Sequence, residues 1–261
     1  MNLIDRVAEA AGRAGGILME YRRTGISVDR KEGHELVTSA DLASERFLRE
    51  TLHLLLPDSS FIGEESWDGT IPESPFWVVD PLDGTNNYAC SYPVFSVSIA
   101  LVENDEISLG CVHDPVRRET FSAVRGEGAF LNDQPIHSTD SDSLGDVLLA
   151  TGFPYSRKPG DLGMDLDVLR RFLCVALGIR RGGSAALDLA YTACGRIGGF
   201  WEEHLSPWDM AAGSLLVQEA GGMVSGYDGE PWSLLSEGVA AAGTGIFDAL
   251  RAGIDGAGKY R

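Results

Sequence analysis

The sequence lacks the patterns that mark several large classes of protein. Four cysteines in 261 residues show neither CxxC pairing nor regular spacing, so we expect reduced thiols, no disulfide and a reducing compartment. No apolar run approaches the roughly 18 residues of a membrane span, and the N-terminus has the periodicity of an amphipathic helix rather than a secretion signal. These absences predict a soluble cytoplasmic protein without a membrane partner.

Basic side chains are missing from a long central stretch. No Lys or Arg occurs between Arg49 and Arg117, whereas twelve acidic residues fall in that window. The net charge of the whole chain is -18, so binding to nucleic acid or to an anionic membrane is not expected. Any chemistry in this window therefore needs cations from outside the chain.

Several catalytic motifs are also missing. The five histidines have neither HExxH nor paired spacing, which argues against zinc hydrolysis. There is no GxSxG nucleophile elbow and no GxxxxGK phosphate loop. Internal repeats and low-complexity segments are absent as well, so the function must rest on other groups.

The pattern of predicted elements changes near residue 142. Residues 1–142 predict helices followed by an antiparallel sheet, and residues 143–261 alternate strand with helix, which predicts a mixed α/β sheet. The two halves can also count as one domain, 1–261, and a hydrophobic content of 44% is ample for its core. The predicted helices cover 1–21, 41–56, 162–176, 184–194 and 206–222, with the last ended by its glycines. The predicted strands cover 36–38, 76–79, 94–102, 110–113, 120–124, 179–180, 197–202, 223–225 and 239–242, and 61–66 is predicted as a loop.

The segment WVVDPLDGTNNY, residues 77–88, carries the first candidate site. An apolar run predicts a buried strand, so Asp80 lies where the chain leaves the core. A turn through the following proline can bring Asp80 and Asp83 together, with the Leu82 carbonyl between them. Two carboxylates and a carbonyl are ligands that Mg²⁺ prefers. The same pattern also fits an aspartate that caps its own turn at the end of a strand.

Four other acidic residues extend this candidate. Glu64 and Glu65 follow a glycine in GEES, where adjacent glutamates are most often solvated loop charges. Asp41 and Asp209 each lie three residues after a Thr or Ser, which predicts a capping box at the start of a helix. A carboxylate fixed at a helix start is also rigid enough to bind a metal, so the two roles are compatible.

Glycines precede two of the predicted helices. Gly84 and Thr85, and separately residues 182–184, offer backbone N–H groups that side chains do not crowd. Such helix starts bind anions, including phosphate. Because glycine pairs before helices are common, an ordinary helix start explains them equally well.

Taken together, GEES, DPLDGTNNY and WDMAAG resemble the inositol monophosphatase family of metal-dependent, lithium-sensitive sugar phosphatases. The similarity extends to LVTSAD near the start and to GGSAALDLAYTACGRIGGFWE in the second half, and so covers nearly the whole chain. The resemblance implies a layered αβαβα sandwich, a homodimer and a small phosphorylated sugar or polyol as substrate. It also implies metal-assisted, in-line hydrolysis by water without a covalent phosphoenzyme.

The resemblance further implies roles for individual residues. Two or three Mg²⁺ ions would be held by Glu64, Asp80, Asp83, Asp209 and the backbone oxygen of Leu82. The catalytic residues would be Glu64 together with Thr85 and Asp41, a pair that orients and deprotonates the attacking water. The substrate would be bound by Asp83, Gly84, Thr85, Ala185 and Glu202, with the N–H groups of Gly84 and Thr85 on the phosphate. Glu65 would orient water or ligands.

The substrate is open among several phosphate esters. Relatives of the family use inositol 1-phosphate, fructose 1,6-bisphosphate, 3′-phosphoadenosine 5′-phosphate, NADP and histidinol phosphate. Few basic residues flank the expected sugar site, which favours a monophosphate and hence inositol 1-phosphate. Arg180 and Arg181 could bind a second phosphate, so a bisphosphate substrate stays an alternative.

Two other readings compete. DGT also ends the signature of aspartate-nucleophile phosphatases, but that signature needs DxD, whereas the aspartates here are three apart. The chain could instead be mainly an interaction protein, because some bacterial relatives assist transcription complexes.

Overall fold

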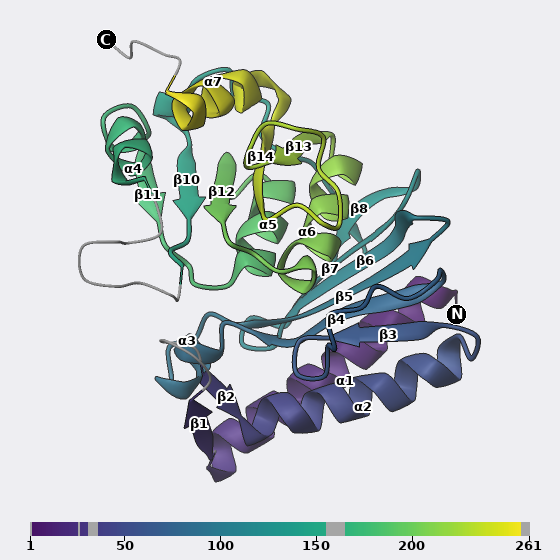
Figure 1. The fold of residues 1–261 in the computed structure, drawn as a ribbon. Coiled ribbons are helices and arrows are strands. Elements are labelled where there is room, and N and C mark those ends of the chain that lie inside the picture. Colours follow the sequence, from purple (N-terminus) through teal and green to yellow (C-terminus); the bar gives the residue numbers. More distant parts are fainter. Residues whose placement is uncertain (1, 26, 31–35, 155–164, 257–261) are drawn as a thin grey trace.

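Helices and sheets alternate as five layers in the computed structural model, which describes residues 2–25, 27–30, 36–154 and 165–256 (Figure 1). A helix pair covers one face of a seven-stranded sheet, a second pair lies between this sheet and a five-stranded one, and a third pair covers the far face of the five-stranded sheet. The predicted αβαβα sandwich is therefore confirmed. No helix in the described ranges is long and apolar enough to cross a membrane.

The first layer consists of α1 (Leu3–Thr24) and α2 (Ser39–Leu55), which pack against each other and against the sheet. The α1 helix begins with a capping box between Asn2 and Asp5, and its apolar stripe is buried. A short two-stranded sheet, β1 (Val28–Arg30) and β2 (Leu36–Thr38), leads into α2. This layer buries the first of three apolar clusters, which includes Leu18, Leu48 and Trp77.

The seven-stranded sheet follows chain order from β3 to β9. Its strands are β3 (Ser60–Gly63), β4 (Phe76–Asp83), β5 (Ser96–Glu103), β6 (Glu106–Asp114), β7 (Glu119–Val124), β8 (Gly128–Leu131) and β9 (Gln134–Ile136). All neighbours are antiparallel except β3, which runs parallel to β4. The prediction of a loop over 61–66 is thus wrong at its start, because Phe61 to Gly63 pair with β4 at the sheet edge.

The second half forms a mixed sheet in the order β11-β10-β12-β14-β13. Its elements are η1 (Leu144–Asp146), β10 (Leu148–Thr151), α4 (Leu166–Leu173), β11 (Gly178–Arg180), α5 (Ala185–Ala193), β12 (Gly199–Glu203), α6 (Pro207–Glu219), β13 (Gly222–Gly226), β14 (Gly238–Gly243) and α7 (Thr244–Asp255). The β10 strand is parallel to both its neighbours, and β14 is antiparallel to both of its own. The mixed sheet that the alternation predicts is confirmed.

The position of α5 and α6 between the two sheets makes them the centre of the molecule. They contact each other, β5 and β6 on one side, and β12 and β14 on the other. Their burial on all sides explains why AALDLAYTA has so little polar character, since a helix covered all round has no solvent face. The predicted start of a helix at Leu162 lies outside the described residues, and α3 (Thr85–Ala89) and α7 were not predicted. The division at residue 142 stays a prediction.

The close approach of α6 to the large sheet requires glycine in β6. A Cβ atom on Gly110 would lie 2.8 Å from the backbone oxygen of Ala212 in α6, and neither backbone can move without disturbing a layer. We predict that Gly110→Ala lowers the free energy of unfolding by about 1–3 kcal/mol, the usual cost of overpacking. Urea unfolding measures the change.

The matched control for this substitution is Gly12→Ala in α1, where a Cβ atom would meet nothing within 4 Å. Replacing a glycine inside a helix by alanine should raise stability by roughly 0.5–1 kcal/mol. Equal effects of the two substitutions would contradict the close packing of α6 on β6.

Candidate metal centre

Three aspartates from distant parts of the sequence meet beside the seven-stranded sheet. Asp80 and Asp83 come from the end of β4, and Asp209 comes from the first turn of α6, which packs on that sheet. One carboxylate oxygen from each residue lies within 4.8 Å of the other two. Asp80 and Asp83 are buried and Asp209 is half-buried, so the cluster is largely shielded from water.

A local irregularity at the end of β4 presents its two aspartates together. The β4–β5 register shifts between Asp80, which faces Ser98, and Asp83, which faces Ser96. Within this bulge the Leu82 N–H donates to Asp80 Oδ1 at 2.9 Å. The capped turn and the converging carboxylates, which the sequence left as alternatives, are therefore both present.

Capping boxes hold the two helix-start carboxylates, as predicted. In α6 the Ser206 N–H donates to Asp209 Oδ2 at 2.7 Å. In α2 the Thr38 N–H and hydroxyl donate to Asp41 Oδ2 at 2.8 and 2.5 Å. In each case the capping contacts occupy one oxygen, so the side chain is fixed while the second oxygen remains for another partner.

For Asp41 the second partner is Thr85. The Thr85 hydroxyl lies 3.1 Å from Asp41 Oδ1 and 3.0 Å from the Leu82 backbone oxygen, and can donate to either. Thr85 is the first residue of α3, preceded by Gly84 in the left-handed region at φ +95°. A Cβ atom at Gly84 would also lie 3.0 Å from the backbone oxygens of Gly183 and Val94, so this turn requires glycine.

Asp83 joins the two halves of the chain. It accepts hydrogen bonds at Oδ2 from the Ser184 hydroxyl at 2.6 Å and the Ala186 N–H at 2.8 Å, at the start of α5. The nearby Asn87 side chain donates to the Gly182 backbone oxygen at 2.9 Å. The roles of Ser184 and Asn87 were missed from the sequence, where the GGS signal suggested only an anion site.

The backbone N–H groups of Glu64 and Glu65 have different partners. Glu64 follows β3, and its N–H donates to the Val79 backbone oxygen at 3.2 Å. Its negative charge adds to the effect of burial in raising the pKa of both Asp80 and Asp209. The oxygens that lie within 4.8 Å of one another belong to the three aspartates, so a ligand role for Glu64 stays a prediction. The Glu65 N–H instead donates to Glu45 Oε2 at 2.9 Å.

The residues expected to face the sugar, Ala185 and Glu202, come from the second half of the chain. Ala185 begins α5, and its backbone N–H opposes the rise in pKa that burial causes at Asp83. Glu202 lies in β12, where burial and the charge of Asp83 raise its pKa to about 8 against the opposing effect of Arg181. Asp188 in α5 is 4% exposed, and burial and Glu202 raise its pKa well above the usual value. Asp188 was missed, although it is the one charged residue of AALDLAYTA.

The electrostatics of the aspartate cluster fit a divalent cation. Burial raises the pKa of Asp80 and Asp209 well above the ordinary range, and the neighbouring acids raise both further. Burial also raises the pKa of Asp83, against the hydrogen bonds from Ser184 and Ala186. Converging oxygens whose negative charges disfavour one another are the donor set that Mg²⁺ takes.

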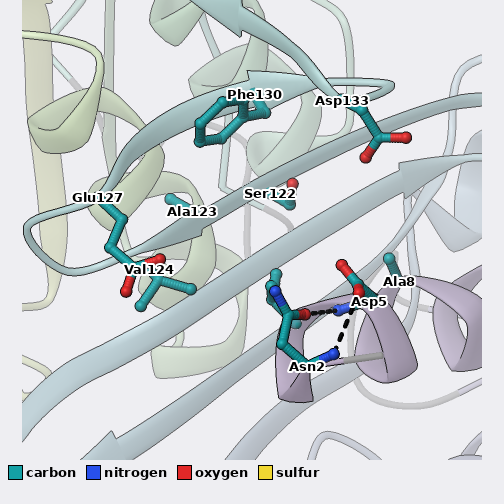
Figure 2. Close-up of a pocket in the computed structure, with 10 residues that line it drawn as sticks. Asn2, Asp5, Ala8, Ser122, Ala123, Val124, Glu127, Phe130 and Asp133 are labelled. Atoms are coloured by element: carbon teal, nitrogen blue, oxygen red, sulfur yellow. Dashed lines mark hydrogen bonds between the residues drawn. The ribbon is translucent and has the colours of Figure 1, made fainter.

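A separate cavity of about 440 Å³ lies between the start of α1 and strands β7 and β8 (Figure 2). Its lining includes Ile4, Asp5, Glu127 and Phe130 but none of the predicted site residues. The candidate site is therefore defined by the carboxylates and not by this cavity.

The raised pKa values predict a pH-dependent stability of the metal-free protein. Unfolded carboxyls ionise near pH 4, whereas Glu202 keeps its proton up to about pH 8 in the folded state. The folded chain therefore binds more protons over this window, so Glu202 contributes stability at low pH that is lost as the pH rises. Urea unfolding in EDTA should show a smaller loss in Glu202→Gln, which cannot ionise.

Comparing the two proteins measures the effect of Glu202 together with its influence on the pKa of Asp188 and Asp209, which acts in the same direction. His113, whose pKa is lowered by burial, acts in the opposite direction but equally in both. Identical pH profiles for wild type and Glu202→Gln would contradict a raised pKa at Glu202.

Comparison with known proteins agrees with the fold and the site. A model of the inositol monophosphatase family matches residues 2–254. Nus factor SuhB from Pseudomonas aeruginosa is 41% identical over 255 residues, 96% of this chain and 93% of that protein. Inositol-1-monophosphatase from Synechocystis sp. is 44% identical over 201 residues, 77% of this chain and 70% of that protein.

A solved structure is similar over the whole fold. The crystal structure of the extragenic suppressor protein suhB from Bartonella henselae matches with a TM-score of 0.91 and 37% identity, covering 97% of this chain and 98% of that chain. The match includes both sheets and the helix pair between them, because almost the whole length aligns. Because the family model, the two relatives and the solved structure each match most of the sequence, the chain belongs to the inositol monophosphatase family.

Proposed function

We propose that the chain hydrolyses inositol 1-phosphate in a Mg²⁺-dependent reaction. Membership of the inositol monophosphatase family supports a metal-dependent phosphatase activity. The observation that carries the proposal is the meeting of Asp80, Asp83 and Asp209, with one oxygen of each within 4.8 Å of the others. A phosphate dianion would be repelled by these carboxylates alone, so divalent ions are required to reverse the local charge.

The ion ligands come from three segments of the chain. Two or three Mg²⁺ ions would be held by the carboxylates of Glu64, Asp80, Asp83 and Asp209 and by the Leu82 backbone oxygen. Bound Mg²⁺ would lower the pKa of water and stabilise negative charge on the phosphate and on the leaving oxygen.

Thr85 and Asp41 prepare the attacking water. When the Thr85 hydroxyl donates to Asp41 Oδ1, 3.1 Å away, its own oxygen is left to accept a proton from water. Asp41 is fully buried, and burial raises its pKa, which favours uptake of the Thr85 proton. The water oxygen then bonds to phosphorus as the ester bond breaks, and the leaving inositol oxygen takes a proton from solvent.

Backbone and carboxyl groups position the substrate. The N–H groups of Gly84 and Thr85 hold the phosphate, and Asp83, Ala185 and Glu202 face the sugar hydroxyls. Glu202, with its pKa of about 8, is protonated at neutral pH and can donate a hydrogen bond to a hydroxyl oxygen. Glu65, whose N–H is fixed on Glu45, orients water near the ions.

The choice of a monophosphate rests on charge. Arg180 and Arg181 are exposed, and the charge of Arg181 lowers the pKa of Glu202, Asp188 and Asp83, so this arginine faces several acidic groups of its own chain. That environment is less favourable for a second phosphate than a cluster of basic residues would be. The Synechocystis relative is named inositol-1-monophosphatase, which supports the same substrate. Fructose 1,6-bisphosphate and bisphosphorylated nucleotides are the alternatives, and a cytoplasmic homodimer remains our expectation for the assembly.

A second candidate function comes from the relative named Nus factor SuhB, which matches 96% of this chain. On that similarity the chain would also bind a transcription complex through protein contacts. A cellular phenotype that survives loss of phosphate release would make this binding role the primary one.

Removing one ligand charge should lower turnover by several orders of magnitude without unfolding the chain. We predict that Asp83→Asn lowers kcat by roughly 10²- to 10⁴-fold, equivalent to the several kcal/mol supplied by metal ions. Its melting temperature without metal should stay the same or rise, because a buried negative charge is removed. Phosphate release and thermal unfolding measure both effects.

The control is Asp58→Asn, which makes the same change at an exposed position. It should leave turnover within twofold of wild type, consistent with the small effects of surface substitutions. Near-normal activity of Asp83→Asn would be incompatible with a ligand role for Asp83.

Phosphate release from three substrates tests the specificity. Inositol 1-phosphate should give a kcat/KM at least tenfold above those of fructose 1,6-bisphosphate and 3′-phosphoadenosine 5′-phosphate, since a missing second phosphate site costs at least about 1.4 kcal/mol. A preference for either bisphosphate would overturn the proposed substrate while leaving the phosphatase assignment in place.

A further inference from the structure

Two tryptophans connect the segments that carry Glu64 and Asp209. Trp67 lies three residues after Glu64, and Trp208 immediately precedes Asp209. Their ring centroids are 5.4 Å apart and the ring planes meet at 79°, an edge-to-face contact. Such pairs are favourable beyond the apolar area that they bury.

Trp208 belongs to the rigid part of the molecule. It is 8% exposed and is part of the apolar cluster between the two sheets. Its backbone oxygen accepts a hydrogen bond from the Ser98 hydroxyl of β5 at 3.1 Å. The start of α6 is therefore fixed on the large sheet.

Trp67 ends the turn that follows Glu64. The Ser66 N–H donates to the Gly63 backbone oxygen at 3.1 Å, which closes the turn, and the Trp67 Nε1–H donates to the Thr70 backbone oxygen at 3.2 Å. The Trp67 side chain is 40% exposed, so one part of its ring covers Trp208 and the other part faces water.

The ring contact opposes an electrostatic repulsion. Glu64 lies three residues before Trp67 and Asp209 lies next to Trp208, so the ring contact joins two segments that each carry an acidic side chain, and like charges on them oppose the contact when no cation is present. A contact between rings on the same two segments holds the carboxylates together before an ion arrives.

We propose that Trp67 is a positioning residue for the metal centre: by packing on Trp208 it keeps Glu64 within reach of an ion that Asp209 also binds. The inference rests on the proposed metal-dependent function. Trp67 has no ligand atom for a hard cation, so its effect falls on the Mg²⁺ concentration that the protein requires.

The test is the Mg²⁺ dependence of the melting temperature, which rises with ligand concentration when the folded state binds the ion. Trp67→Ala should need roughly three- to tenfold more Mg²⁺ for half of the rise, the loss expected for one aromatic pair. Trp67→Phe, which keeps a ring, should stay within about twofold of wild type.

Ile71→Ala is the matched control, since Ile71 lies in the same segment and is 38% exposed. It should leave the Mg²⁺ dependence unchanged. At saturating Mg²⁺, Trp67→Ala, Trp67→Phe and Ile71→Ala should each recover at least half of the wild-type kcat. Their KM for inositol 1-phosphate should be unchanged, because the catalytic residues are intact. Trp67→Leu serves as the second variant if Trp67→Ala does not fold.

An unchanged Mg²⁺ midpoint in folded Trp67→Ala or Trp67→Leu would overturn the proposal, and so would an equal shift in Ile71→Ala. Failure of the proposed function looks different. In that case the wild type would show a Mg²⁺-dependent rise in melting temperature but no release of phosphate from inositol 1-phosphate.

Discussion

The mutual repulsion of buried carboxylates is the constraint on which the rest of the structure depends. Asp80, Asp83 and Asp209 approach within 4.8 Å although burial already disfavours their charged forms. A chain with only local structure would separate them. The five layers supply the apolar burial that keeps β4 and α6 in contact, and capping boxes and hydrogen bonds fix each side chain within that frame.

The helix pair α5 and α6 brings residues from the second half of the chain to the aspartates of β4. Because α5 and α6 lie between both sheets, the starts of both helices reach the end of β4 from the opposite half of the chain. Ser184 and Ala186 donate to Asp83, and α6 contributes Asp209. The carboxylates that repel one another therefore lie where the two halves of the chain meet, next to the residues expected to bind the sugar.

Much of the fold and of the acidic cluster could be predicted from the sequence. The capping boxes at Asp41 and Asp209 are local patterns, so they were readable directly, and family resemblance supplied the layered order. The contact of Ser184 with Asp83 spans 101 residues and the β3–β4 pairing depends on a neighbouring strand, so neither leaves a local signal. Asp188 was missed because an acid in an apolar helix gains its meaning only from burial beside Glu202.

The capping hydrogen bond that holds Asp209 bears on the size of the cation that would fit between the carboxylates. One of its oxygens is committed to the Ser206 N–H, so the other cannot shift without loosening the first turn of α6. Asp80 is restrained in the same way by the Leu82 N–H. Oxygens that cannot follow an ion inward or outward discriminate by size, and Mg²⁺ prefers distances of about 2.0–2.1 Å whereas Ca²⁺ needs about 2.3–2.6 Å. In the proposed metal centre, the backbone that starts a helix would thus also set the diameter of the cation.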